Sequence, residues 1–209
     1  MAKIIAVANQ KGGTGKTTTS TCLAGALQLL GKKVLLVDCD AQCNATDTYG
    51  AQTEDVCTLF DVMTRQGTVE EGIQHCEVGD ILPSDNAMKD IDEQLVRDIG
   101  KNFRLREAIE SVSEQYDYIV LDTPPQLGLM LVNALIASNS VIVPMTPDRY
   151  AVAGLSQLSQ TINDVRRYFN QNLKIEGLLL NKFGGREVLS KEAIEALPEA
   201  ANLMGTRVL

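Results

Sequence analysis

The sequence predicts an α/β fold, a doubly wound and mostly parallel sheet with helices on both faces. Short runs of β-branched and other apolar residues recur along the chain, and longer stretches with helical periodicity separate them. The runs Val34–Val37 and Ile119–Leu121 lack polar alternation, which is typical of strands buried on both faces. A glycine-rich segment joins the first strand to the first helix, as is frequent in folds of this class.

The individual elements follow from these patterns. We expect strands at Ile4–Ala8, Val34–Val37, Tyr118–Leu121, Val141–Pro144 and Ile175–Leu180. We expect helices at about Lys16–Leu30, Phe103–Gln115, Leu127–Ala137, Leu155–Asn170 and Glu187–Ala201. Gly31 is expected to end the first helix. The stretch Gln42–Leu82 is rich in Thr, Asp, Gly and Gln, so it is expected to hold loops and short helices near the functional face.

Composition limits the classes of protein to consider. The chain has 209 residues, 44% of them hydrophobic, which suits one large domain with a substantial core. A net charge of -8 excludes a general attraction to nucleic acid or anionic membranes, so binding of a polyanion requires a local basic patch. The five cysteines lack metal-ligand spacing and favour free thiols in a reducing compartment. Because neither a signal peptide nor a membrane-spanning run is present, we expect a cytoplasmic protein.

The first strand leads into Gln10–Thr18 and then into a helix, which is the setting of a phosphate-binding loop. Glycines let successive backbone amides turn toward an anion, and the following helix presents its positive end. Lys16 can reach the outer phosphates, and the Thr17 hydroxyl can bind Mg²⁺. The candidate nucleotide-binding residues of the loop are Lys11, Gly12, Gly13, Thr14, Gly15, Lys16, Thr17 and Thr18. The alternative is a glycine-rich turn with an exposed lysine.

Carboxylates follow two of the predicted strands. Asp122 ends one strand, and Asp38 and Asp40 follow another. Because parallel strands end at the same edge of a sheet, these carboxylates can lie near the loop, where Asp122 can hold the hydration shell of Mg²⁺. Asp122 could instead cap a helix or turn, and Asp38 and Asp40 could be solvated loop residues.

The segment Lys11–Thr17 resembles the deviant Walker A motif of the ParA/MinD family of partition and positioning ATPases. Gln10 stands where the general phosphate-loop pattern has glycine, and a lysine follows it at Lys11. Asp38–Ala45 resembles the first switch of that family, and Ile119–Pro125 resembles the second. Further similar segments are Val143–Pro144, Tyr150–Leu155 and Leu180–Phe183.

The resemblance implies ATP and Mg²⁺ as cofactors and a homodimer that forms with ATP. Lys11 would contact the phosphates bound by the partner subunit and supply charge in trans, so that Lys11, Lys16 and Asp40 would be the catalytic residues. Asp40 would orient the attacking water, whereas Asp38 would support the metal beside Thr17 and Asp122. Asn181 would recognise adenine, with a simple turn asparagine as the alternative.

The branches of the family differ in features that can be sought here. An iron–sulfur branch needs cysteines near the second switch, but none follows Cys76. A basic amphipathic C-terminal helix is missing, so no membrane binding is expected. Short partition ATPases bind nonspecific DNA, associate with the nucleoid when ATP-bound, and are activated by a centromere-binding, ParB-like protein. Candidate DNA contacts are Lys182, Arg186 and Lys191, with Arg166, Arg167 and Arg207; a solvated face remains an equal alternative.

We therefore expect residues 1–209 to form a single P-loop ATPase domain, without the final loop and helix that family members carry after the strand corresponding to Thr206–Leu209. The first hypothesis is a Mg²⁺-dependent ATPase with weak basal activity that drives plasmid or chromosome partition. The second is an ATP-gated scaffolding or positioning module that does not bind DNA. The third is a small-molecule kinase or ligase built on the same core.

Overall fold

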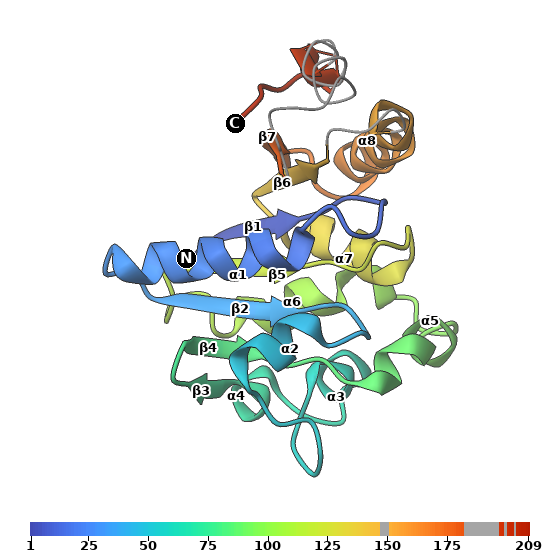
Figure 1. Cartoon of the computed structure of the whole chain (residues 1–209). Coiled ribbons are helices and arrows are strands. Elements are labelled where there is room, and N and C mark those ends of the chain that lie inside the picture. Colours follow the sequence, from blue (N-terminus) through green and yellow to red (C-terminus); the bar gives the residue numbers. More distant parts are fainter. Residues whose placement is uncertain (147–150, 182–196, 199, 203) are drawn as a thin grey trace.

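The computed structural model describes residues 1–146, 151–181, 197–198, 200–202 and 204–209, which contain a seven-stranded sheet (Figure 1). The strands are β1 (Lys3–Val7), β2 (Val34–Asp38), β3 (Gln74–Cys76), β4 (Gly79–Leu82), β5 (Tyr118–Asp122), β6 (Ser140–Met145) and β7 (Lys174–Leu180). Their order across the sheet is β3-β4-β2-β5-β1-β6-β7. Every pairing is parallel except that of β3 with β4. The predicted fold class is confirmed.

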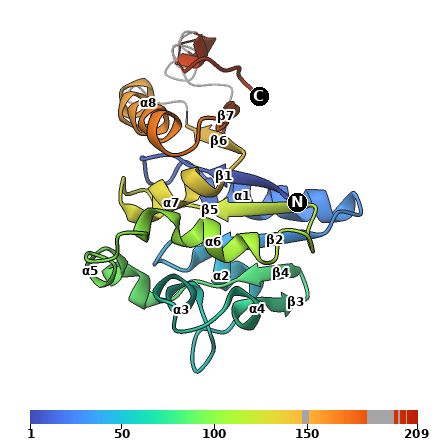
Figure 2. The same ribbon diagram turned by 180° about the vertical axis from the view of Figure 1, so that it is seen from behind.

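Helices cover both faces of this sheet. On one face lie α1 (Lys16–Leu29) and α2 (Asn44–Tyr49), in front of the strands in Figure 1. On the other lie α6 (Arg104–Glu110), α7 (Leu129–Ala137) and α8 (Ala151–Tyr168), of which α6 and α7 face the viewer in Figure 2. Shorter helices are α3 (Leu59–Thr64), α4 (Val69–Gly72) and α5 (Ile91–Gln94), with 3-10 turns η1 (Asn86–Asp90) and η2 (Lys101–Phe103).

Successive residues of the central strands alternate between two apolar clusters. Val7 and Val120 belong to the cluster beneath α1 and α2, whereas Ala6 and Leu121 belong to the larger cluster beneath α6, α7 and α8. These four side chains are fully buried. Alternating side chains of a strand point to opposite faces, so a strand covered by helices on both sides must be apolar throughout.

The structure corrects the prediction for Gln42–Leu82. This stretch contains the expected short helices, but it also contains β3 and β4, which form an antiparallel pair at the edge of the sheet. β3 is Gln-His-Cys and is only partly buried, so it lacks the apolar run by which a central strand is recognised. The sequence pattern therefore gave no signal for it.

Helix boundaries also differ from the expected ones. The expected helix Phe103–Gln115 ends early, because α6 stops at Glu110 and turns follow. Helix α8 begins at Ala151 rather than Leu155. Most of the expected helix Glu187–Ala201 lies outside the described residues, although 197–198 and 200–202 are helical. A parallel bridge joins Leu178 to Val208, so the C-terminal residues lie beside β7.

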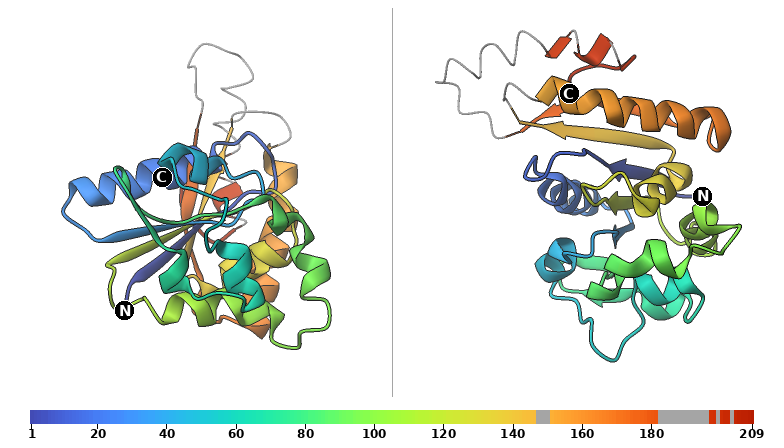
Figure 3. Two further views of the ribbon diagram at one scale, coloured as in Figure 1. Left: turned by 90° about the horizontal axis from the view of Figure 1, so that it is seen from below. Right: turned by 90° about the vertical axis from the view of Figure 1, so that its right-hand side faces the viewer.

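The sheet topology brings polar residues together at the carboxyl ends of the strands. β1 lies between β5 and β6, and in the right-hand view of Figure 3 the orange C-terminal third is on one side of β1 and the cyan and green segments on the other. Asp38 and Asp122 end neighbouring strands as register partners, and Asn181 follows β7. The chain adds β2 to β5 on one side of β1 and then adds β6 and β7 on the other side, so the order of the strands reverses at β1. In open α/β sheets, ligands usually bind at the carboxyl ends of the strands beside such a reversal.

Two predictions from composition can be compared with the structure. All five cysteines are free thiols, as predicted. Among the residues that the structure describes, none of the helices combines the length and apolar character that a membrane span requires.

Candidate nucleotide-binding site

The segment between β1 and α1 is a loop that folds around the backbone of Lys11. The Lys11 carbonyl accepts hydrogen bonds from the Thr14 hydroxyl at 3.3 Å and from Lys16 Nζ at 3.4 Å. Gly13 and Gly15 have φ values of 73° and 89°, in the left-handed region that side chains rarely adopt. Gly15 is also the N-cap of α1, so the loop ends at the positive end of a helix. Loop and helix together form a suitable site for an anion.

Asn181 packs against this loop from the end of β7. Its Nδ2 donates to the Thr14 carbonyl at 3.2 Å, and its backbone amide donates to the Met145 carbonyl at 2.7 Å. A Cβ atom on Gly15 would stand 2.0 Å from Asn181 Nδ2. Residue 15 is therefore restricted to glycine both by its backbone conformation and by the asparagine. The predicted role of Asn181 in reading adenine stays a prediction, but its position beside the loop is established.

Two further amides attach the entrance of the loop to the other half of the sheet. Asn9 is buried, donates from Nδ2 to the Pro144 carbonyl at 2.7 Å, and accepts the Lys11 amide at 3.0 Å. Gln10 Nε2 donates to Gln157 of α8 at 2.5 Å. The backbone that carries Lys11 is thus fixed to both β6 and α8.

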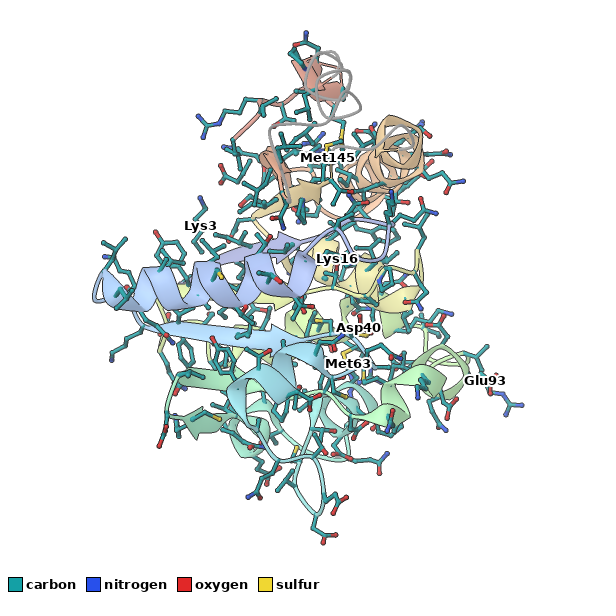
Figure 4. The ribbon with its side chains drawn as sticks, in the orientation of Figure 1. Lys3, Lys16, Asp40, Met63, Glu93 and Met145 are labelled. Carbon is teal, nitrogen blue, oxygen red and sulfur yellow. The ribbon has the colours of Figure 1, made fainter. Side chains whose placement is uncertain are left out.

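Lys16 is buried although it carries a cationic side chain, with 7% of its surface exposed. Burial lowers the pKa of Lys16, and the carboxylates of Asp122 and Asp40 oppose this shift by favouring the charged amine. Figure 4 shows Lys16 and Asp40 at the same end of the strands. Among the described residues no carboxylate lies within ion-pair distance of Lys16, and a desolvated ammonium in such surroundings is well suited to bind an anionic ligand.

Asp122 is a buried acidic residue whose pKa is strongly raised by its surroundings. Its Oδ1 accepts the Ser20 hydroxyl at 2.9 Å, whereas its buried Oδ2 has no hydrogen-bond partner among the described residues. Burial raises the pKa of Asp122 to about 7; the Thr17 and Ser20 hydroxyls lower it, and the neighbouring carboxylates raise it. A buried carboxylate oxygen without a partner needs a cation or a proton.

Asp38 and Asp40 form a small network in the segment after β2. Asp38 is fully buried: Oδ1 accepts the Asp40 amide at 3.1 Å, and Oδ2 accepts both the amide and the hydroxyl of Thr46, at 2.9 and 2.8 Å. Burial raises the pKa of Asp38, and these hydrogen bonds oppose the rise. Asp40 is half-buried and accepts the Gln42 amide at 3.0 Å.

The residues near the loop fit a magnesium ion. The Thr17 hydroxyl and Asp122 Oδ2, which has no hydrogen-bond partner among the described residues, are oxygen ligands of the kind that Mg²⁺ prefers, and Thr17 is near enough to Asp122 to lower its pKa. Within the described part of the chain no group of three or more acidic, cysteine or histidine side chains could hold a metal alone. Asp38 differs, because both of its oxygens already accept hydrogen bonds.

Comparison with known proteins gives the family. A family model described as an AAA domain matches residues 2–175. The sporulation initiation inhibitor protein Soj of Bacillus subtilis is 43% identical over 199 residues, which cover 93% of this chain and 78% of that protein. The chain belongs to the ParA/MinD family of ATPases. The chromosome partitioning protein ParA of Myxococcus xanthus is 37% identical over 196 residues, covering 92% of this chain and 69% of that one.

A solved structure supports the nucleotide site of this ParA/MinD-family ATPase. Cobyrinic acid a,c-diamide synthase from Mycobacterium smegmatis, with bound ADP and magnesium, matches with a TM-score of 0.91 at 30% identity. The match covers 95% of this chain and 82% of that one. The ligands of this similar structure support a nucleotide and Mg²⁺ as ligands of the family.

Three of the six predicted DNA contacts lie outside the residues that the structure describes. These are Lys182, Arg186 and Lys191. Arg166 donates to the Leu173 carbonyl at 2.8 Å, and Arg167 lies 5.4 Å from the centre of the Tyr168 ring. Only Arg167 of these two is exposed. The described residues therefore do not decide between a DNA-binding face and a solvated one.

Three residues of the site had no place in the sequence prediction. Asn9 fixes the Lys11 backbone, Ser20 binds Asp122, and Thr46 binds Asp38. Ser20 lies one helical turn after Lys16, so helical spacing from the loop could have indicated it. Asn9 and Thr46 stand next to motif residues, but their side-chain partners could not be read from spacing.

Proposed function

We propose that this ATPase is a switch that hydrolyses ATP with Mg²⁺, dimerises when ATP is bound, and then binds nonspecific DNA to drive partition of a plasmid or chromosome. Its relatives named Soj and ParA support this reading, and the latter carries chromosome partitioning in its name. The observation that carries the proposal is the convergence of Lys16, Thr17 and Asp122 on one glycine-rich loop.

Each of these residues has a defined task in binding the nucleotide. The loop amides and the start of α1 receive the phosphates, and Lys16 neutralises the outer ones. Thr17 and Asp122 hold Mg²⁺, which when bound neutralises charge on the β- and γ-phosphate oxygens. Asn181 recognises the adenine base in this proposal. Its hydrogen bond to the Thr14 carbonyl joins this residue to the phosphate loop.

Hydrolysis in this proposal depends on Asp40 and Lys11. Asp40 orients the attacking water, and its effect on the pKa of Lys16, which binds the phosphates in this proposal, supports that role. Lys11 is exposed on a backbone that Asn9 fixes, so its side chain can reach the phosphates held by a second subunit. A cation supplied in trans stabilises charge that develops during phosphoryl transfer. Dimerisation then becomes a requirement for hydrolysis.

The proposed cycle places the protein in the cytoplasm, on the nucleoid when ATP is bound. A centromere-binding, ParB-like protein activates hydrolysis and thereby releases the DNA. Lys182, Arg186 and Lys191, with exposed Arg167, are the proposed phosphate contacts. Because the chain carries a net charge of -8, this binding must come from a local patch and weaken steeply with salt.

One observation favours a second candidate, a small-molecule ligase. The similar solved structure bears the name of a synthase of a small molecule, cobyrinic acid a,c-diamide. Such an enzyme forms ADP only with its small substrate and needs neither DNA nor a dimer. An ATP-gated scaffold, in contrast, dimerises with ATP but ignores DNA.

The deciding experiment measures mass by light scattering after size-exclusion chromatography at low salt, with ATP, with ADP, and with ATP plus a short nonspecific duplex. The proposal expects a dimer only with ATP and a complex with DNA only from that dimer. Lys16→Ala is the control that should stay monomeric in each case. A dimer that forms with ATP but does not bind DNA indicates the scaffold. A monomer that makes ADP only with a small substrate indicates the ligase and overturns the proposal.

A further inference from the structure

We propose that Thr46 is a positioning residue for ATP hydrolysis, because through Asp38 it fixes the segment that carries Asp40. The inference rests on the proposed function, in which Asp40 orients the attacking water. It assigns a role to a residue outside the phosphate loop, and it assigns Asp38 to this network rather than to the metal.

The geometry forms a continuous path from α2 to Asp40. The amide and the hydroxyl of Thr46 donate to Asp38 Oδ2 at 2.9 and 2.8 Å, and Asp38 Oδ1 accepts the Asp40 amide at 3.1 Å. Both Thr46 and Asp38 are fully buried. Each carboxylate oxygen is therefore used to hold backbone of the first switch, and the orientation of the carboxylate is fixed from both sides.

The Thr46 hydroxyl has a second bond that fixes it in turn. It accepts the amide of Ser84 at 3.0 Å, just after β4, while it donates to Asp38. A hydroxyl has one hydrogen to donate, and this one goes to the carboxylate. The segment with Asp40 is thereby joined through Thr46 and Asp38 to the end of β4, which is part of the sheet.

The local helix cannot provide this rigidity by itself. α2 has only six residues, and its N-cap is Cys43 in the left-handed region without a side-chain cap. So short a helix is marginal in isolation, and its position depends on tertiary bonds. Loss of the Thr46 hydroxyl should therefore loosen the first switch while the phosphate loop, with its own hydrogen bonds, keeps its shape.

Thr46→Val tests the inference, because valine keeps the side-chain shape and removes the hydroxyl. We expect kcat for ATP hydrolysis to fall about 10- to 100-fold, as misplacement of a reacting group does. The Kd for ATP should stay within about twofold, because binding uses other residues. Thr46→Ser keeps the hydroxyl and should therefore hydrolyse ATP at a rate close to that of the wild type.

The matched control is Thr48→Val in the same helix. Thr48 is exposed, and its hydroxyl donates only to the local Asn44 carbonyl at 2.7 Å. This variant should hydrolyse ATP at the wild-type rate. Wild-type activity in Thr46→Val, or equal loss in Thr46→Val and Thr46→Ser, overturns the inference.

A second variant keeps the test decisive if Thr46→Val does not fold. Asp38→Asn replaces an acceptor with an amide, and we expect the same fall in kcat with an unchanged midpoint of activity in a Mg²⁺ titration. A raised midpoint means that Asp38 acts on the metal, which overturns the assignment. If the wild-type protein binds ATP but hydrolyses none under any condition, the proposed function fails instead, and the two failures are distinguishable.

Discussion

The three glycines of the phosphate loop provide a test in which backbone conformation and side-chain contact are separated. Gly12 lies outside the left-handed region with open space at its Cβ position. Gly13 has a φ of 73° and the same open space. Gly15 has a φ of 89°, and its Cβ position is 2.0 Å from Asn181 Nδ2. Substitution of each by alanine therefore adds one effect at a time.

The expected free energies of unfolding follow from this difference. Gly12→Ala should be neutral or stabilising by up to ~1 kcal/mol, because alanine restricts the unfolded chain. Gly13→Ala should be destabilised by about 1 kcal/mol, because the left-handed conformation costs ~1–2 kcal/mol for a residue with a Cβ. Gly15→Ala must also displace Asn181 and break its bond to Thr14, which adds ~0.5–1.5 kcal/mol. Its total is about 2 kcal/mol.

Urea unfolding of the nucleotide-free protein measures these differences as changes in midpoint at constant slope. Thermal unfolding provides a second measure, in which about 2 kcal/mol lowers the Tm by about 4–8 °C for a chain of this size. The decisive comparison is the double variant Gly15→Ala with Asn181→Ala, which should be no less stable than Gly15→Ala alone, because the bond from Asn181 to Thr14 is already broken in that single variant. Equal stability of Gly15→Ala and Gly13→Ala would refute the contact argument, and equal stability of all three variants would refute the backbone argument.

The remaining predictions concern the charged residues. Lys11→Ala should bind ATP as the wild type does and lose at least about 10-fold in DNA- and partner-stimulated hydrolysis, because the charge acts in trans; unchanged hydrolysis in a phosphate-release assay contradicts this mechanism. Asp40→Ala should form an ATP dimer that persists over hours by light scattering, and a monomer in ATP would contradict the role of Asp40. The pKa of Asp122 is raised from 3.8 to about 7, so its contribution to stability is present below about pH 4 and is lost as pH rises through 7. In Asp122→Asn, the free energy of unfolding of the nucleotide-free protein, measured with urea, should fall less between pH 4 and 8 than in the wild type. An identical dependence of this free energy on pH in the two proteins argues against the raised pKa.

The sequence predicted the central strands and the phosphate loop because each has a local signal. Ile119–Leu121 is a continuous apolar run, and buried parallel strands require one. Asp122 ends such a run, and the loop that leads to Lys16 follows another, so the topology alone brings them to the carboxyl ends of neighbouring strands. The position of the loop and of the carboxylates in the fold was therefore predictable, whereas their roles in binding stay predictions.

The edge of the sheet and the supporting hydrogen bonds were not predictable in the same way. β3 and β4 are short and partly polar, and they are strands because they pair with each other and because β4 pairs with β2. Asn9 binds Pro144, 135 residues away, and Thr46 binds Ser84, 38 residues away. Side-chain bonds of this kind depend on tertiary structure, and no spacing rule for single sequences contains them.

The amides that attach the phosphate loop have a consequence for how the protein responds to its medium. Asn9, Gln10 and Asn181 are uncharged at any physiological pH, and their bonds to Pro144, Gln157 and Thr14 involve no ion pair. Salt screening and titration therefore act on Lys16, Asp122 and any bound polyanion, but leave the framework of the loop unchanged. Ionic strength should therefore change the Kd for charged ligands without changing the conformation of the phosphate loop.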